Sequence, residues 1–246
     1  NMSAIAILNY LLAEKKKKAE IPQNAAIVKS IVSSTMADAI AKDYGVAVFD
    51  VLTGFKYIGE KIKEFEKSKE YTFLFGFEES YGCLVGTHAR DKDGVVAVMM
   101  LCEAAAYYKE QNSSIEEELQ KLYQKYGYYQ EETMQVTLKG MDGAKKMQEM
   151  IDTMRKEPPK TLGGYKIQRI RDYKEQEILD IETGKKVATG LPKSNVLYYE
   201  LENSAWCCVR PSGTEPKIKY YVGVRENTSQ GAKEQIEKIK ADLQNK

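Results

Sequence analysis

The chain has 246 residues, enough for one large or two small domains, because domains usually comprise about 100–200 residues. Its 37 Lys and Arg residues balance 36 Asp and Glu residues, and this net charge of +1 favours neither a nucleic-acid surface nor a polybasic membrane patch. The 43% hydrophobic content and the 17 tyrosines suffice for a packed core and exclude global disorder. No apolar run reaches the ~20 residues of a membrane-spanning helix, and the basic run 15–18 follows the first apolar stretch, which is the reverse of a signal peptide.

The first half of the chain alternates helical and strand patterns. In chain order, the sequence predicts a helix led by Ser3, a strand at 25–32, a helix from Ser34 or Thr35, a strand at 46–52, a helix at 56–65, a strand at 71–77, a long apolar helix at 94–108 and a helix between Asn112 and Gly127. Apolar strands separated by helices are typical of a parallel sheet that is covered on both faces. We therefore expect a parallel-sheet α/β/α domain over residues 1–127.

The pattern changes in the second half to short strands separated by turn signals. The sequence predicts a strand at 134–138, an amphipathic helix at 143–154, a break at Pro158-Pro159, strands at 165–170, 177–181, 196–201, 205–209 and 217–224, and a charged helix at 230–243. Asn203-Ser204 is expected to form a hairpin turn. The predicted fold class is therefore α/β, with the α/β/α domain followed by a smaller antiparallel α+β domain over residues 128–246.

The four cysteines are Cys83, Cys102, Cys207 and Cys208. Their spacing is typical of neither a disulfide framework nor a zinc site. Adjacent residues on a strand point to opposite faces, so Cys207 and Cys208 would diverge. We expect buried, reduced thiols in a cytoplasmic protein.

Residues 210–217 link two predicted strands and have a composition that suits an anion. Ser212 and Thr214 offer hydroxyl donors on either side of Gly213, which permits a tight turn, and Arg210 offers a planar fork of N–H groups. The loop is not a Walker motif. The residues indicate a phosphate site, with an ordinary Pro/Ser/Gly turn carrying solvated charges as the alternative.

Residues 76–82 follow a strand of the predicted parallel sheet, where such sheets bind ligands. Glu78 there can accept hydrogen bonds from sugar hydroxyls, with Ser80 as a further partner. Paired carboxylates also suit a metal or glycosidase site, but adjacent Glu78 and Glu79 would diverge on an extended backbone. A polar, solvated loop is the alternative interpretation.

Residues 88–94 precede the long apolar helix. Asp91 or Asp93 can cap this helix, and Arg90 and Lys92 lie near its N-terminus, where an anion is also favoured. His88 is the single histidine of the chain, and a lone surface histidine is more often a bystander than a base.

Four motifs, taken in order and at these spacings, resemble the α-D-phosphohexomutase family and specifically its phosphoglucomutase branch. They are Thr53-Gly54-Phe55-Lys56 and residues 76–82, 90–94 and 210–214, and the resemblance spans residues 53–221. That family has four domains around a cleft, with a phosphoserine loop in domain one and a magnesium-binding loop in domain two. This sequence contains neither loop. The resemblance therefore implies the C-terminal half of such an enzyme, with domain three at 1–127 and domain four at 128–246.

The resemblance also implies a role for each matched residue. Glu78 and Ser80 match the loop that holds the sugar hydroxyls, and Thr53 and Gly54 match its neighbour at the cleft. Arg90 and Lys92 match positions that face the substrate and assist catalysis, with His88 as a further candidate. The matches to the phosphate-binding loop of domain four are Arg210, Ser212, Gly213, Thr214 and, on the following strand, Lys219.

In that family, phosphate moves between carbons 1 and 6 of a hexose through a bisphosphorylated sugar. The resemblance thus implies an isomerase of carbohydrate metabolism that uses Mg²⁺, whose ligands lie outside this chain, and glucose 1,6-bisphosphate as activator and intermediate. Its partners would be a phosphorylated hexose and the missing N-terminal domains one and two, with neither nucleic acid nor membrane involved. The chain alone is expected to bind without catalysing. The alternatives are a phosphomannomutase or phosphopentomutase, or a non-catalytic phosphosugar-binding module.

Overall fold

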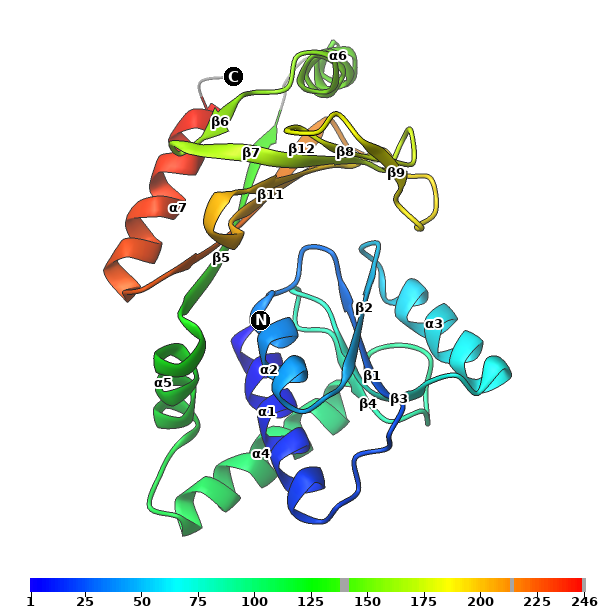
Figure 1. Cartoon of the computed structure of the whole chain (residues 1–246), viewed down its shortest axis with the longest axis vertical. Helices are drawn as coiled ribbons and strands as arrows, with labels where there is room; N and C mark the ends of the chain where they lie inside the picture. Colours follow the sequence, from blue (N-terminus) through cyan, green and yellow to red (C-terminus); the bar gives the residue numbers. More distant parts are fainter. Residues whose placement is uncertain (138–141, 213–214, 245–246) are drawn as a thin grey trace. The chain divides into compact units, whose positions relative to one another are not determined.

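The computed structural model describes residues 1–137, 142–212 and 215–244. It divides the chain into two compact units, residues 1–127 and residues 128–246 (Figure 1). Each unit has its own sheet and its own helices, so each is described by itself. Within the described ranges, no helix is both long enough and apolar enough to cross a membrane.

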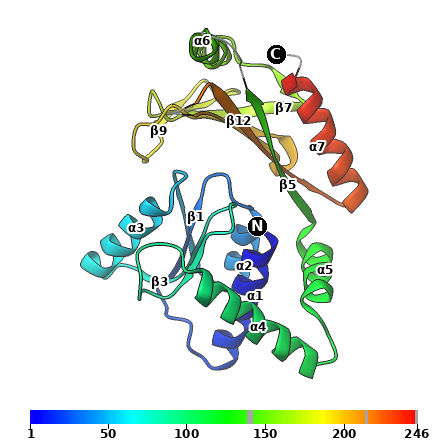
Figure 2. The same cartoon turned by 180° about the vertical axis from the view of Figure 1, so that it is seen from behind.

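The N-terminal unit is a four-stranded sheet with helices on both faces (Figures 1 and 2). Its elements are α1 (Met2–Lys17), β1 (Ala25–Ser30), α2 (Met36–Asp43), β2 (Ala47–Val51), α3 (Phe55–Ser68), β3 (Thr72–Phe77), β4 (Cys83–Val85), α4 (Gly94–Glu110) and α5 (Ile115–Tyr126). The strand order is β2-β1-β3-β4, and β1 pairs in parallel with both β2 and β3. Every residue of β1 is buried, as expected of a central strand covered on both faces.

The predicted fold class is confirmed for this unit, with one difference at the sheet edge. Strand β4 runs antiparallel to β3 and pairs Phe77 with Cys83, so the sheet is mixed where a purely parallel one was expected. Residues 78–82 are consequently the tip of a β-hairpin. The three residues of β4 are too few to produce a strand pattern in the sequence.

The C-terminal unit is built on one antiparallel sheet in the order β5-β12-β11-β10-β7-β8-β9, which confirms the predicted α+β class. Its elements are β5 (Tyr128–Thr137), α6 (Gly143–Lys156), β6 (Thr161–Leu162), β7 (Tyr165–Asp172), β8 (Glu177–Asp180), β9 (Lys186–Ala188), β10 (Leu197–Leu201), the 3₁₀ turn η1 (Glu202–Ser204), β11 (Trp206–Pro211), β12 (Lys217–Glu226) and α7 (Ser229–Gln244). The sequence did not predict the short strands β6 and β9. It did predict the turn at Asn203 and Ser204, where both residues have positive φ.

Helices α6 and α7 pack on one face of this sheet. Ile151 of α6 and Ile236 of α7 belong to the same buried cluster as Tyr220 of β12. Cys207 lies on this core face, and Cys208 is also buried, on the opposite face of β11. Cys83 is buried as expected, but the expectation was wrong for Cys102, which is exposed on α4.

Candidate functional site

Glu78 lies where β3 ends, and its carboxylate reaches across to the chain that follows β2. Its Oε1 accepts a hydrogen bond from the Gly54 N–H at 2.6 Å, and its own N–H donates to the Gly82 carbonyl at 2.8 Å, which closes the hairpin tip. Gly54 has a φ of 121°, a backbone conformation that side chains rarely tolerate, and half-buried Thr53 precedes it. The structure therefore brings together three of the predicted sugar-site residues, while predicted Ser80 stands exposed at the tip.

Burial governs the protonation of this carboxylate. Glu78 is only 6% exposed, and burial raises the pKa of its carboxyl above the ordinary value, although the Gly54 N–H opposes this. The charge of nearby Lys92 also lowers the pKa. The Lys92 side chain lies against Gly82, where an added Cβ would come within 2.8 Å of the Lys92 Cδ atom. Lys92, which the sequence predicted as a site residue, therefore borders the sugar loop.

A hydroxyl cluster that the sequence did not reveal supports the same loop. Ser30, at the end of β1, donates to Glu79 Oε2 at 3.1 Å and contacts the Ser33 hydroxyl at 2.8 Å. Both serines are fully buried. The ends of β1, β2 and β3 thus contribute polar groups at one edge of the sheet, where parallel strands bind ligands.

A buried lysine of β1 forms ion pairs close to this edge of the sheet. Lys29 is 1% exposed and lies 2.8 Å from Asp50 Oδ1 and 3.3 Å from Asp38 Oδ2. Burial lowers the pKa of Lys29, but the two carboxylates outweigh burial and raise it above the ordinary value. The cation therefore stays charged and ties β1 to β2 and α2.

Arg90 and His88 make contacts outside the Glu78 cluster. Arg90 donates to Glu66 of α3 at 2.5 Å and to the carbonyl of Thr87 at 2.7 Å. The His88 Nε2 atom lies 2.9 Å from Asp93, and this contact holds the pKa of the Asp93 carboxyl below its usual range. Asp93 caps α4, since its Oδ1 accepts the N–H groups of Val95 and Val96.

In the C-terminal unit, Arg210 and Lys219 stand directly opposite each other on β11 and β12. Their neighbours Val209 and Tyr220 belong to the core, so the two cations share the other face of the sheet. Like charges in this arrangement repel, and an anion bound between them relieves the repulsion. The ladder register therefore places a half-buried Arg and an exposed Lys where a phosphate would be favoured.

The turn beyond these strands is closed by its backbone. The Ser212 N–H donates to the Lys217 carbonyl at 2.7 Å, and the Ser212 hydroxyl accepts from the Glu215 N–H at 3.3 Å. Lys217 forms an ion pair with Glu215 at 2.9 Å. Predicted residues Gly213 and Thr214 lie outside the described residues.

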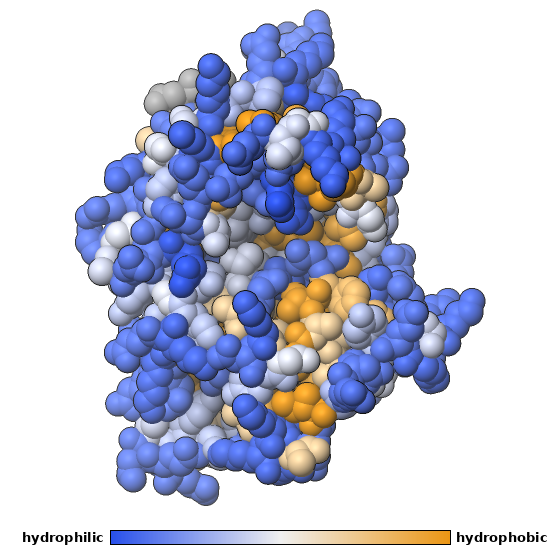
Figure 3. Space-filling view, in the orientation of Figure 1, coloured by the Kyte–Doolittle hydropathy of each residue, from blue (hydrophilic) through white to orange (hydrophobic). Residues whose placement is uncertain are grey.

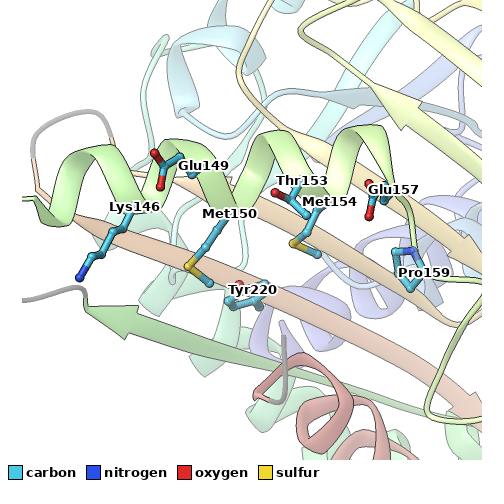
Figure 4. Close-up of a pocket in the computed structure, with 8 residues that line it drawn as sticks. All are labelled: Lys146, Glu149, Met150, Thr153, Met154, Glu157, Pro159 and Tyr220. Atoms are coloured by element: carbon cyan, nitrogen blue, oxygen red, sulfur yellow. The ribbon is translucent and has the colours of Figure 1, made fainter.

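Two further features bear on the kind of ligand. Among the residues that the structure describes, no three His, Cys, Asp or Glu side chains gather as a metal site. A cavity of about 570 Å³ opens between α6 and the sheet, where Met150 and Met154 extend toward Tyr220 (Figure 4). Its described lining includes none of the predicted site residues. Its apolar floor does not suit a sugar phosphate.

Comparison with known proteins identifies the relatives of this chain. The family model for phosphoglucomutase/phosphomannomutase, alpha/beta/alpha domain III, matches residues 1–126. The chain is 32% identical over 225 residues to the phosphoglucomutase of Staphylococcus aureus strain MRSA252, covering 92% of this chain and 40% of the relative. It is 35% identical over 195 residues to the phosphoglucomutase of Staphylococcus saprophyticus, covering 79% of this chain and 35% of the relative.

A solved structure agrees on the fold. A phosphoglucomutase/phosphomannomutase family protein from Burkholderia thailandensis superposes with a TM-score of 0.57 at 12% identity, covering 97% of this chain and 41% of that one. At this identity the likeness concerns the fold alone. The chain spans about 40% of the length of the Staphylococcus aureus phosphoglucomutase that it matches.

Proposed function

Because this chain belongs to the phosphoglucomutase/phosphomannomutase family, we propose that it supplies the substrate-binding part of an isomerase that interconverts hexose 1-phosphate and hexose 6-phosphate. The observation that carries the proposal is the buried Glu78 carboxylate, fixed at 2.6 Å by the Gly54 N–H where the parallel strands end. A carboxylate held in this way is a preorganised acceptor for sugar hydroxyls. It offers about four lone-pair sites, of which Gly54 occupies one.

Each unit has a separate task in this proposal. In the N-terminal unit, Glu78 orients the sugar and Lys92 balances its charge and faces the phosphate. In the C-terminal unit, Arg210 and Lys219 hold a phosphate group, Arg210 by two parallel N–H contacts and Lys219 as a point charge. Ser212, with Gly213 and Thr214, completes this phosphate-binding turn.

The phosphoryl transfer itself belongs to a longer protein. Phosphoryl transfer depends on positioning and on stabilisation of charge by a metal ion. We assign Mg²⁺ and the phosphorylated serine to the part of the relatives that this chain does not span, and glucose 1,6-bisphosphate to the role of activator. Glucose is preferred over mannose or a pentose in this proposal because of the Glu78-Glu79-Ser80 sequence.

The phosphate assignment is tested by titrating glucose 6-phosphate into the chain and two variants. Arg210→Ala should lose a charge-assisted contact worth about 1.5–3 kcal/mol, which is roughly 10- to 150-fold in Kd. Lys217→Ala is the matched control, since its ammonium is already paired with Glu215 and its loss should matter less. Repeating the titration at higher salt should weaken exposed contacts most. Unchanged affinity of Arg210→Ala would refute the phosphate assignment.

The isomerase assignment is tested by turnover. The chain alone, given glucose 1-phosphate, the bisphosphate and Mg²⁺, should produce no glucose 6-phosphate, and adding the unmatched N-terminal part of a relative should restore activity. Turnover by the chain alone, at the roughly 1–100 per second of ordinary phosphoryl-transfer enzymes, would contradict the proposal. Tight phosphosugar binding with no restoration would instead favour a non-catalytic binding module.

A further inference from the structure

Helix α4 carries apolar side chains on a face that the rest of the described chain leaves open. Val95 is 81% exposed, Val98 61% and Met99 55%, and Cys102 is also exposed. These four residues recur at helical spacing and form one stripe, called here the α4 stripe. Of the six large hydrophobic residues that are exposed among those described, three lie in this stripe.

The opposite face of the same helix is already in use. Met100, Ala104 and Tyr108 are buried, and α4 packs against α1 within the N-terminal unit. The helix is therefore apolar on both faces, a composition typical of helices enclosed within a larger structure. In the view of Figure 3, most of the visible surface is hydrophilic and apolar residues gather in a few patches. A clustered apolar stripe on a largely polar surface marks an interaction site.

We infer that the α4 stripe is a docking surface for the portion of a phosphohexomutase that this chain does not span. The greater part of each curated relative lies outside the matched region, so an occupant of sufficient size is expected. The stripe belongs to the unit matched by the domain III model. This inference rests on the proposed function, because the partner is the portion to which phosphoryl transfer was assigned.

The α4 stripe lies next to the loop that carries Lys92. The helix begins at Gly94, two residues after Lys92, and Asp93 links its first turn to His88. A partner seated on Val95 and Val98 would therefore adjoin the loop that borders Glu78. Docking would cover apolar surface and, at the same time, bring the partner's reactive groups beside the sugar loop.

Cys102 provides a direct test, because it is the exposed thiol while Cys83, Cys207 and Cys208 are buried. The probe is a recombinant polypeptide comprising the N-terminal part of the Staphylococcus aureus phosphoglucomutase that this chain does not match. With the probe at ten times its Kd, the rate of maleimide labelling of Cys102 should fall about tenfold. Unchanged labelling at a saturating excess of the probe overturns the inference.

Variants separate the stripe from general surface effects. Val98→Asp and Met99→Lys should abolish the protection of Cys102, whereas Ile181→Asp, at an exposed apolar residue of the other unit, should preserve it. Equal losses from Met99→Lys and Ile181→Asp would overturn the inference. So would protection of Cys102 that rises with the concentration of the chain alone, since the occupant would then be a second copy.

The test also distinguishes this inference from the proposed function. Stripe variants should bind glucose 6-phosphate with the Kd of the parent chain and unfold at the same temperature. If the stripe variants lose docking but still bind the phosphosugar, the result supports the docking inference and does not bear on the proposed function. Failure of the parent chain to bind phosphosugar, with docking intact, would count against the proposed function and leave the stripe in place.

Discussion

The two units position their candidate binding groups in different ways. The N-terminal unit buries the carboxylate of Glu78 and fixes it with the backbone N–H of Gly54, while Ser30 holds the neighbouring Glu79. The C-terminal unit leaves Arg210 and Lys219 near the surface and relies on the ladder register to set them opposite each other. An acceptor that must select hydroxyl groups needs directional support, whereas cations that attract phosphate act over longer distances and need only proximity.

The largest expected effect comes from removing the enclosed cation. Lys29→Met leaves Asp38 and Asp50 facing each other without their counter-charge, and we expect a loss of about 3 kcal/mol, the lower end for a broken buried pair because both carboxylates reach water. Urea unfolding followed by circular dichroism measures it. Lys42→Met, at an exposed position of α2, is the control. Coincident curves for Lys29→Met and the parent would show that the N-terminal unit does not depend on this cation.

A substitution in the other unit tests whether the two units unfold independently. Gly223 lies against the ring of Trp206, and an added Cβ would approach the ring atoms to 2.3 Å. Gly223→Ala should therefore cost about 2 kcal/mol through overpacking. Trp206 is the single tryptophan of the chain, so its fluorescence reports this unit alone. Gly94→Ala, where the added Cβ meets open space, should change little. A large fluorescence shift for Lys29→Met would contradict independent unfolding.

The pH dependence of stability tests the cost of burying Glu78. Its raised pKa means that the folded state retains this proton to higher pH than the unfolded state, whose carboxyl titrates near 4.5. Stability from this group is therefore present below that value and lost as pH rises through the raised pKa. Glu78→Gln removes this loss, so the variant should gain stability relative to the parent as pH increases, while its affinity for glucose 6-phosphate falls. Exposed Glu64→Gln is the control. A parent-like pH profile for Glu78→Gln would refute the burial cost.

The smallest expected effect concerns the cation pair of the C-terminal unit. Lys219→Gln removes repulsion across the ladder and should stabilise the unit by about 0.5 kcal/mol. The gain should shrink with added salt, because the side chain of Lys219 is exposed. Thermal unfolding monitored through Trp206 measures it. Destabilisation by Lys219→Gln would show that the two cations are already balanced by groups of the chain itself.

Most of the fold could be predicted from local pattern, because long apolar strands and amphipathic helices carry a clear periodicity. The exceptions are instructive. Strands β4, β6 and β9 contain two or three residues each, too few for any period. Strand β5 begins at Tyr128, six residues before the predicted start, because its polar first part is held by pairing with β12. Such pairing is a tertiary effect that local sequence does not encode.

The candidate site was predictable only as a set of loops. The rule that ligands bind where parallel strands end placed Glu78 and Gly54 at one edge of the sheet, but the hydrogen bond between them depends on the fold. The Ser30–Glu79 contact has no sequence signal of its own. The orientation of Arg90 was not predictable either, because it depends on Glu66, which lies on a different element.

The pairing of β5 with β12 also has a consequence for the order of folding during synthesis. The two strands pair over all ten residues of each, yet residues 138–216 separate them along the chain. The N-terminal unit is complete at Gly127 and can fold as soon as it leaves the ribosome. Strand β5 follows immediately and then waits, with unpaired backbone groups, until β12 has been made. A wait of this kind slows folding and exposes a strand edge to other chains, so the nascent protein should depend on chaperones chiefly while residues 128–226 are being synthesised.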